Sequence, residues 1–151
     1  IVDCLFLLRK MTMTSMTQEE KQEFLADSHI GVLALNDSAY GPLSVPIWYD
    51  YKTGGELWFL TAPNSRKGKL LKAGIRLSLV AQAEDPPYKY VSIEGPITSI
   101  VVANEDDLLG MAVRYLGLDA GKKYAEANEA IGSVLVRVQP ERWLGVDYSK
   151  A

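Results

Sequence analysis

The sequence predicts a mainly β protein, a small antiparallel barrel with a few short helices. About six apolar runs of strand length are bounded by Gly, Pro, Asn and Asp. Most of these runs are joined by short turns, as in hairpins, and not by the long crossovers that parallel strands need. The chain has 151 residues and no repeat or low-complexity tract, which suits one domain around one core.

The domain is predicted to open with a helix over residues 17–27. Thr17 and Glu20 stand three positions apart, as in a capping box, and apolar residues follow them. A strand over 29–36 comes next, and the turn-forming sequence DSAYG ends it.

A proline interrupts the next strand, over 42–51. Because Pro46 has no N–H to donate, this strand is expected to lie at a sheet edge or to break near Pro46. The sequence KTGG then turns the chain, so that residues 56–61 return as the hairpin partner. Another strand is predicted over 76–83.

The remaining strands lie on either side of a helical region. A long strand is predicted over 88–101, with a bend near Gly95 and Pro96. The sequence GSVLVRVQPERWLGVDYS closes the chain as one or two strands.

Two consecutive helices are predicted between these strands. The first spans 104–117, because Asn104 suits its N-cap, acidic residues fill its first turn and Gly117 suits its end. The second, more polar helix spans 120–130.

Composition argues against several classes of function. The formal net charge is −3, whereas a general nucleic-acid binder should be basic, so no nucleic-acid partner is expected. Apolar residues make up 48% and charged residues 23%, as in ordinary globular proteins. The chain has one Cys and one His, which leaves little for a zinc site, and no metal is expected.

Residues 1–16 precede the predicted domain, which covers 17–151. Their apolar run is far shorter than the roughly 20 residues that span a membrane, and they lack the basic start and cleavage site of a signal peptide. We expect this leader to be disordered or an upstream extension, with the natural start at Met11, Met13 or Met16. No membrane association and a cytoplasmic location are expected.

The stretch TAPNSRKGKLLKAG is unusually cationic for this chain. A strand ending at Thr61, a Pro-Asn turn and a helix starting near Ser65 suit a phosphate group. The two hydroxyls are donors, Arg66 could form two parallel hydrogen bonds, and Lys67 adds a point charge. Alternatively, Ser65 only caps the helix and the cations form a solvated face.

Several blocks of sequence resemble one family. LTAPNSRKGKLL resembles the phosphate-binding segment of the pyridoxamine 5′-phosphate oxidase-like split barrels, which bind flavins. SVPIWYDY, DPPYKYVSIEGPI, RYLG with YAEA, and VLVRVQPERWLGVDYSK extend the likeness over 17–150, and together they resemble the actinobacterial branch that uses the deazaflavin coenzyme F-420.

The resemblance implies a homodimer of split β-barrels with cofactor sites at the subunit interface. It implies that the cofactor phosphate is held by Thr61, Ser65, Arg66 and Lys67. It also implies that the ring is approached by Val45, Pro46, Ile47, Trp48 and Leu60, and by Tyr88, Lys89, Tyr90 and Trp143 of the partner subunit.

The implied function is hydride transfer from F-420 to an electron-poor small organic acceptor. No side chain is a certain catalytic residue, and Tyr88, Lys89 and Tyr90 are candidate proton donors. The C-terminal Arg–His pair of true pyridoxamine phosphate oxidases is missing, so vitamin B6 oxidation is not expected. An FMN-dependent reductase or oxidase and a non-catalytic F-420 or FMN carrier remain alternatives.

Overall fold

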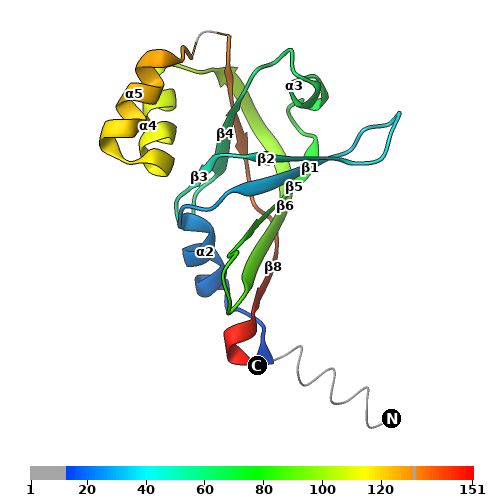
Figure 1. The fold of residues 1–151 in the computed structure, drawn as a ribbon. Coiled ribbons are helices and arrows are strands. Elements are labelled where there is room, and N and C mark those ends of the chain that lie inside the picture. The colour runs from blue at the N-terminus through cyan, green and yellow to red at the C-terminus, as the bar shows by residue number, and fades with distance from the viewer. Residues whose placement is uncertain (1–12, 131) are drawn as a thin grey trace.

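The strands form an antiparallel sheet that curls into a half-barrel, as seen in the computed structural model in Figure 1, which describes residues 13–130 and 132–151. The strands are β1 (Gly31–Leu35), β2 (Leu43–Ile47), β3 (Tyr49–Tyr51), β4 (Leu57–Thr61), β5 (Arg76–Gln82), β6 (Lys89–Val102), β7 (Val134–Val138) and β8 (Arg142–Asp147). The helices are α2 (Gln18–Ala26), α3 (Arg66–Leu70), α4 (Glu105–Leu116), α5 (Leu118–Ala127) and the 3-10 turn η1 (Tyr148–Lys150). The predicted mainly β fold is confirmed.

The sheet is split at a single residue of the chain. The strand order is β2-β1-β5-β6-β7-β4-β3, and β8 pairs with β6. The two outermost strands, β2 and β3, are therefore consecutive in sequence and are separated only by Trp48. The expectation drawn from Pro46 is confirmed in both respects, because β2 is an edge strand and the predicted strand breaks two residues after the proline.

The long strand β6 holds the two halves of the sheet together. It pairs with β5 and β8 through its first half and with β7 through its second half. Its register shifts between Ile97 and Ser99, close to the bend predicted near Gly95 and Pro96. The predicted hairpin is confirmed for β3 and β4, where Tyr49 faces Phe59.

The core lies on the inner face of the curled sheet. One row of paired residues crosses five strands on this face: Val45, Leu33, Leu79, Ile93 and Trp143. The middle three side chains are 1% exposed or less. Burial of such aliphatic side chains is worth about 1.5–3 kcal/mol each, which makes this row a main source of stability.

The adjacent row faces outward and is also largely apolar. Its residues are Pro46, Val32, Val80, Ser92 and Leu144. Leu144 is 55% exposed. The outer face of the sheet therefore carries a largely apolar stripe, interrupted by Ser92, that the described residues leave partly exposed.

The helix boundaries follow their caps. Thr17 and Glu20 form the predicted capping box of α2, and Asn104 caps α4 together with Asp107. Gly117 ends α4 and also serves as the N-cap of α5. The helix predicted over 120–130 therefore begins two residues earlier than expected and ends at Ala127.

Residues just before the predicted start of the domain at residue 17 also pair with the sheet. The Thr14 carbonyl accepts a hydrogen bond of 2.8 Å from the Asp147 backbone N–H, and Ser15 forms a bridge with Val146. Residues 14–16 thus extend the β8 edge of the sheet, because the exposed N–H and C=O groups of that edge find partners there. The expectations for residues 1–10 lie outside the described residues. Within the described ranges, no helix is both long and apolar enough to cross a bilayer.

Candidate functional site

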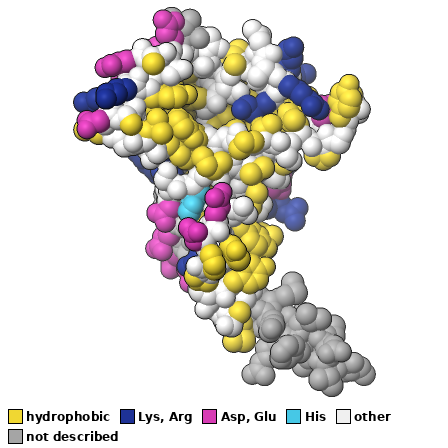
Figure 2. Space-filling view, viewed as in Figure 1, with side chains coloured by type: hydrophobic (Ala, Val, Ile, Leu, Met, Phe, Trp, Pro, Cys, Tyr) yellow, Lys and Arg dark blue, Asp and Glu magenta, His cyan; other side chains and the backbone are white. Residues whose placement is uncertain are grey.

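A cavity of about 380 Å³ opens beside the split in the sheet. Sequence analysis predicted six of the residues that line it: Pro46, Ile47, Trp48, Leu60, Thr61 and Lys67. Further lining residues come from α4, α5 and the segment before β7: Leu108, Met111, Tyr124, Asn128, Glu129, Ala130 and Ser133. In Figure 2, hydrophobic side chains cover the region between α4–α5 and α3, and Lys and Arg side chains gather at α3.

Lys67 is the cation of this cavity. Burial lowers the pKa of its ammonium group, and the side chain is half-buried. No ion pair with Lys67 is found among residues 13–130 and 132–151. Because removing an uncompensated charge from water is costly, Lys67 is suited to an anionic ligand. Thr61 lies in the same cavity and is 6% exposed.

The position of Lys67 depends on the glycine that follows it. A Cβ atom at Gly68 would lie 2.2 Å from the Ala62 carbonyl oxygen and 2.7 Å from that of Pro63. Only glycine therefore lets α3 pack so closely against the end of β4, and this packing holds Lys67 at the cavity.

Ser65 acts as the N-cap of α3. Its hydroxyl accepts a 3.0 Å hydrogen bond from the Gly68 N–H and donates a 2.7 Å hydrogen bond to the Ala62 carbonyl. These contacts agree with the alternative interpretation of the sequence, in which Ser65 only caps the helix. The hydroxyl proton that a phosphate would need is already donated within the loop.

Arg66 points away from the cavity. Its guanidinium lies 3.3 Å from the Asp37 carboxylate and 5.3 Å from the centre of the Tyr40 ring. These partners belong to the loop between β1 and β2. Of the four residues expected at the phosphate, the cavity thus contains Thr61 and Lys67.

Trp48 is enclosed by aromatic rings of the two long helices. It stacks on Tyr115 of α4, with 5.0 Å between ring centroids, and meets Tyr124 of α5 at 5.4 Å in a tilted contact. The indole therefore links the split in the sheet to the α4–α5 pair, and one side of it lines the cavity.

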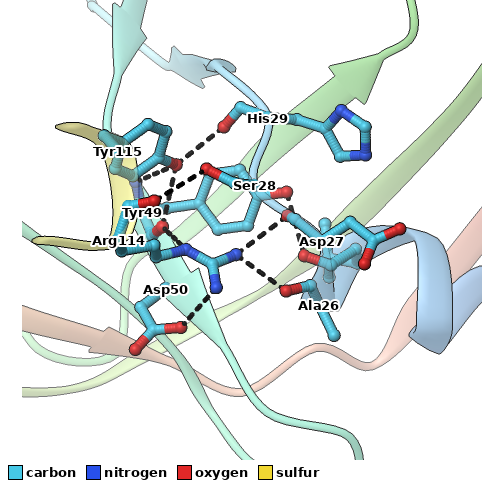
Figure 3. A network of polar contacts seen from close by, with 9 residues as sticks. Ala26, Asp27, Ser28, His29, Tyr49, Asp50, Arg114 and Tyr115 are labelled. Carbon is cyan, nitrogen blue, oxygen red and sulfur yellow. Dashed lines mark hydrogen bonds and ion pairs between the residues drawn. The ribbon is translucent and has the colours of Figure 1, made fainter. Parts of the chain in front are cut away.

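A polar network fixes α4 on the strands behind Trp48 (Figure 3). The Tyr115 hydroxyl accepts from the Tyr49 N–H at 3.0 Å, and its proton is directed at the carbonyls of His29 at 2.7 Å and Tyr49 at 2.9 Å. Three backbone groups, two of Tyr49 in β3 and one of His29 in the segment before β1, thus hold the ring that supports Trp48.

Arg114 supplies the rest of this network. Its guanidinium donates to the carbonyls of Tyr49, Ala26 and Asp27 at 2.8–3.0 Å. It also lies 3.1 Å from the Asp50 carboxylate. One side chain of α4 thereby holds the end of α2 and strand β3, and this arrangement orients the wall of the cavity.

The residues expected from the partner subunit lie elsewhere in the chain. Tyr88, Lys89 and Tyr90 line a second cavity of about 530 Å³ together with Tyr148. Lys89 is 3.0 Å from the Asp147 carboxylate. Burial acts to raise the pKa of Asp147, but hydrogen bonds from Ser149 and Lys89 outweigh it and lower this pKa below its usual value.

Val45 and Trp143 lie on the inner face of the sheet. Both pack against the hydrophobic core, and Trp143 meets the Tyr51 ring edge-on at 5.8 Å. Neither lines the cavity around Lys67. Val45 faces the core side of the sheet, whereas its neighbour Pro46 faces outward.

Sequence analysis missed the helical wall of the cavity. The sequence predicts the helix that carries Leu108 and Met111, but not that these side chains line a cavity. It also does not predict the contacts of Tyr115 and Tyr124 with Trp48. The blocks RYLG and YAEA did mark this region, but their spacing does not reveal that both helices turn a tyrosine toward one indole.

An antiparallel half-barrel with a few helices, split beside Trp48, has the architecture of the split-barrel proteins. The chain belongs to the pyridoxamine 5′-phosphate oxidase family, whose sequence profile matches residues 17–147.

Solved structures agree with this assignment. The fold resembles a conserved hypothetical protein of Mycobacterium tuberculosis, with a TM-score of 0.71 and 26% identity over 91% of this chain and 88% of the other. An F-420 reductase matches with a TM-score of 0.68 and 22% identity over 81% and 94%. An FAD-binding protein of Mesorhizobium loti matches with a TM-score of 0.63 and 19% identity, over 87% of this chain and 94% of the other. No curated protein matches the chain significantly.

Proposed function

We propose that this protein is an oxidoreductase that holds coenzyme F-420 in the cavity around Lys67 and reduces an electron-poor small organic acceptor. The observation that carries the proposal is the half-buried ammonium of Lys67, which has no ion-pair partner among the described residues. Membership of a family that binds flavin-type cofactors adds support.

The cavity has the two kinds of surface that such a cofactor requires. Lys67 and Thr61 offer a cation and a hydroxyl at one side, which suits a phosphate. Pro46, Ile47 and Leu60 offer apolar surface, which suits a tricyclic ring. A volume of about 380 Å³ lies within the range of small-molecule sites, which is roughly 300–1,000 Å³.

A bound reduced deazaflavin supplies a hydride, and the protein binds, orients and shields it. Met111 and Leu108 of α4 keep water from the apolar side of the cavity. Lys67 would hold the charged end of the cofactor, and Pro46 and Ile47, beside the split between β2 and β3, would contact its ring. We assign no proton donor within the cavity, and Tyr88, Lys89 and Tyr90 of the partner subunit stay candidates.

Two features favour F-420 over FMN. Lys69 and Lys72 are exposed beyond Lys67 and have no ion-pair partner in the described chain, which suits the anionic glutamate tail of F-420. The likeness of the fold to an F-420 reductase supports the same choice. FMN is the alternative cofactor.

We propose that the protein acts as a homodimer through the outer face of the sheet. The largely apolar stripe that runs from Pro46 through Val32, Val80 and Ser92 to Leu144 supports this, because the described residues of one subunit leave it partly exposed to water. A second copy could cover it by a two-fold contact of the same face.

A turnover assay tests the enzymatic part of the proposal. Purified protein is mixed with reduced F-420 and a panel of enones, quinones and nitroaromatic compounds, and oxidation of the cofactor is followed by absorbance. We expect catalysed oxidation with at least one acceptor, and its loss in Lys67→Ala. Stoichiometric binding without any turnover would instead support a carrier.

A further inference from the structure

We infer that Ser133 is a ligand of the cofactor phosphate and acts with Thr61 and Lys67 in place of Ser65. This inference rests on the proposed function, because it deepens the same cavity. The three side chains line one cavity but come from the end of β4, from α3 and from the start of β7.

The sequence motif implies that Ser65 donates a hydrogen bond to the phosphate, but its hydroxyl is engaged within the loop. The Ser65 proton is donated to the Ala62 carbonyl at 2.7 Å, and its oxygen accepts from Gly68. Turning this proton toward a ligand would break the hydroxyl's hydrogen bond to the Ala62 carbonyl, which would keep only the 3.2 Å hydrogen bond from the Ser65 N–H.

Ser133 has a free hydroxyl and a fixed backbone. No side-chain hydrogen bond of Ser133 is found in the part of the chain that the structure describes. Its N–H donates to the Ala130 carbonyl at 2.9 Å, and its carbonyl accepts from the Ala103 N–H at 3.0 Å. The preceding Gly132 has a φ of +80°, a conformation that glycine adopts readily and that turns the chain into β7.

The strand register places Ser133 opposite Ala62, the residue after Thr61, and both Ser133 and Thr61 line the cavity. Thr61 faces Val134 in the β4–β7 ladder, so Ser133 lies one residue further along, opposite the chain that leaves β4. The Thr61 hydroxyl also lacks a partner within the described ranges. Two hydroxyls and one ammonium that have no partner among the described residues thus share the cavity, and each of them can donate to a phosphate oxygen.

One acidic residue opposes an anion in this cavity. Glu129 lies on the exposed rim, and its carboxylate would repel a phosphate. Burial lowers the pKa of Lys67, and no ion pair joins Lys67 to Glu129 among the described residues. The charge of Lys67 is therefore not neutralised by Glu129, and the donors dominate the inner part of the cavity.

The experiment compares ligands that differ only in the phosphate. FMN and riboflavin are titrated into the cofactor-stripped protein, and quenching of tryptophan fluorescence gives both dissociation constants. The preference for FMN is the ratio of the two constants. We expect Ser133→Ala to reduce this preference about tenfold while leaving riboflavin binding unchanged, as expected for a lost hydrogen bond to a charged group.

Matched variants separate a direct contact from a structural effect. Ser133→Thr keeps the hydroxyl and should keep the preference for FMN. Ser65→Ala should lower the melting temperature through the lost cap, with less effect on the preference than Ser133→Ala. The same comparison with F-420 and its deazaflavin precursor lacking the phosphodiester should give the same order.

The outcomes distinguish this inference from the proposed function. If Lys67→Ala removes the preference for the phosphate but Ser133→Ala leaves it intact, the cavity holds the cofactor and the role of Ser133 is refuted. If the wild type shows no preference for the phosphorylated ligands, or binds none of them, both the proposed site and the role of Ser133 are refuted.

Discussion

The indole of Trp48 lies parallel to the phenol ring of Tyr115, with 5.0 Å between the ring centroids and 5° between the ring planes. Trp48 is the one residue between β2 and β3, where the sheet is split. The stacked rings of Trp48 and Tyr115 therefore lie at the split, where β2 and β3 do not pair with each other. Through this contact α4 packs against the barrel. The cavity around Lys67 begins at this junction.

The Tyr115 hydroxyl should matter as much as its ring. Tyr115→Phe keeps the stack on Trp48 but removes the hydrogen bonds to Tyr49 and His29, so we expect a loss of about 1–2 kcal/mol in the free energy of unfolding. Tyr115→Leu removes the stack as well and should cost more. Urea denaturation measures the free energy of unfolding of both variants. The near-ultraviolet circular dichroism spectrum should change strongly only in Tyr115→Leu.

Two results would argue against this view of the junction. One is a Tyr115→Phe variant as stable as the wild type. The other is a near-ultraviolet spectrum that Tyr115→Leu leaves unchanged, since a tryptophan that loses a stacked partner should alter its signal. Tyr40→Phe is a matched control, because the Tyr40 ring is 73% exposed.

Stability should fall at mildly acidic pH because of His29. Burial is the main cause that lowers the pKa of this imidazole below 6.5, against the opposing effect of Asp27. The unfolded chain then binds the proton more readily, so the stabilising contribution of His29 is complete above pH 6.5 and is lost as pH falls through the lower folded pKa.

Replacing the imidazole tests this pH dependence. His29→Gln should flatten the decline of unfolding free energy just below pH 6.5, while leaving the steeper acid loss from the carboxylates. The pKa values of Glu20, Glu94 and Asp147 are lowered in the fold, so their contributions disappear only at more acidic pH. An identical slope in wild type and His29→Gln would contradict the assignment.

Cofactor affinity should weaken at alkaline pH through Lys67. Its pKa lies below the usual 10.5 because of burial, and only the protonated form attracts a phosphodiester. Affinity for F-420 is then full below this pKa and falls as pH rises through it. Lys67→Arg retains its charge to about pH 12 and should delay the fall, as shown by titrations at successive pH values.

Lys67→Met should separate binding from stability. It removes a half-buried charge that lacks a partner within the described residues, so the melting temperature of the cofactor-free protein should not decrease. Affinity for F-420 should decrease about tenfold or more. A variant that loses stability while binding normally would show that Lys67 serves the fold.

The outer stripe of the sheet should control assembly. Leu144→Glu places a charge on this stripe, so we expect sedimentation equilibrium to change from a dimer to a monomer. Val102→Glu is the control, because Val102 is 79% exposed near the end of β6 and lies outside the stripe. A monomeric wild type that binds F-420 tightly would contradict a site at the dimer interface.

Local signals predicted most of the fold. Pro46 has no N–H to donate, and this alone placed its strand at an edge or a break. The capping residues Thr17 and Asn104 marked the starts of α2 and α4 correctly. The start of α5 was missed because Gly117 serves both helices, a dual use that its residue type does not reveal.

The candidate site was less predictable because it depends on which way each side chain points. Thr61 and Lys67 do lie in one cavity, but Arg66, next to Lys67 in sequence, turns to Asp37. Trp143 packs on Tyr51, and its approach to the cofactor of the partner subunit stays a prediction. Neither contact leaves a local signal, because the partners are more than 25 residues away in the chain.

The most direct measurement is a titration of the cofactor-stripped protein with F-420 and, separately, with FMN, followed by quenching of tryptophan fluorescence. Trp48 lines the cavity, so a ligand there should quench its emission. We expect micromolar or tighter binding of F-420, much weaker binding of FMN, and loss of the F-420 signal in Lys67→Met. Tighter binding of FMN would assign the protein to flavin chemistry, and no binding of either would contradict a cofactor site around Lys67.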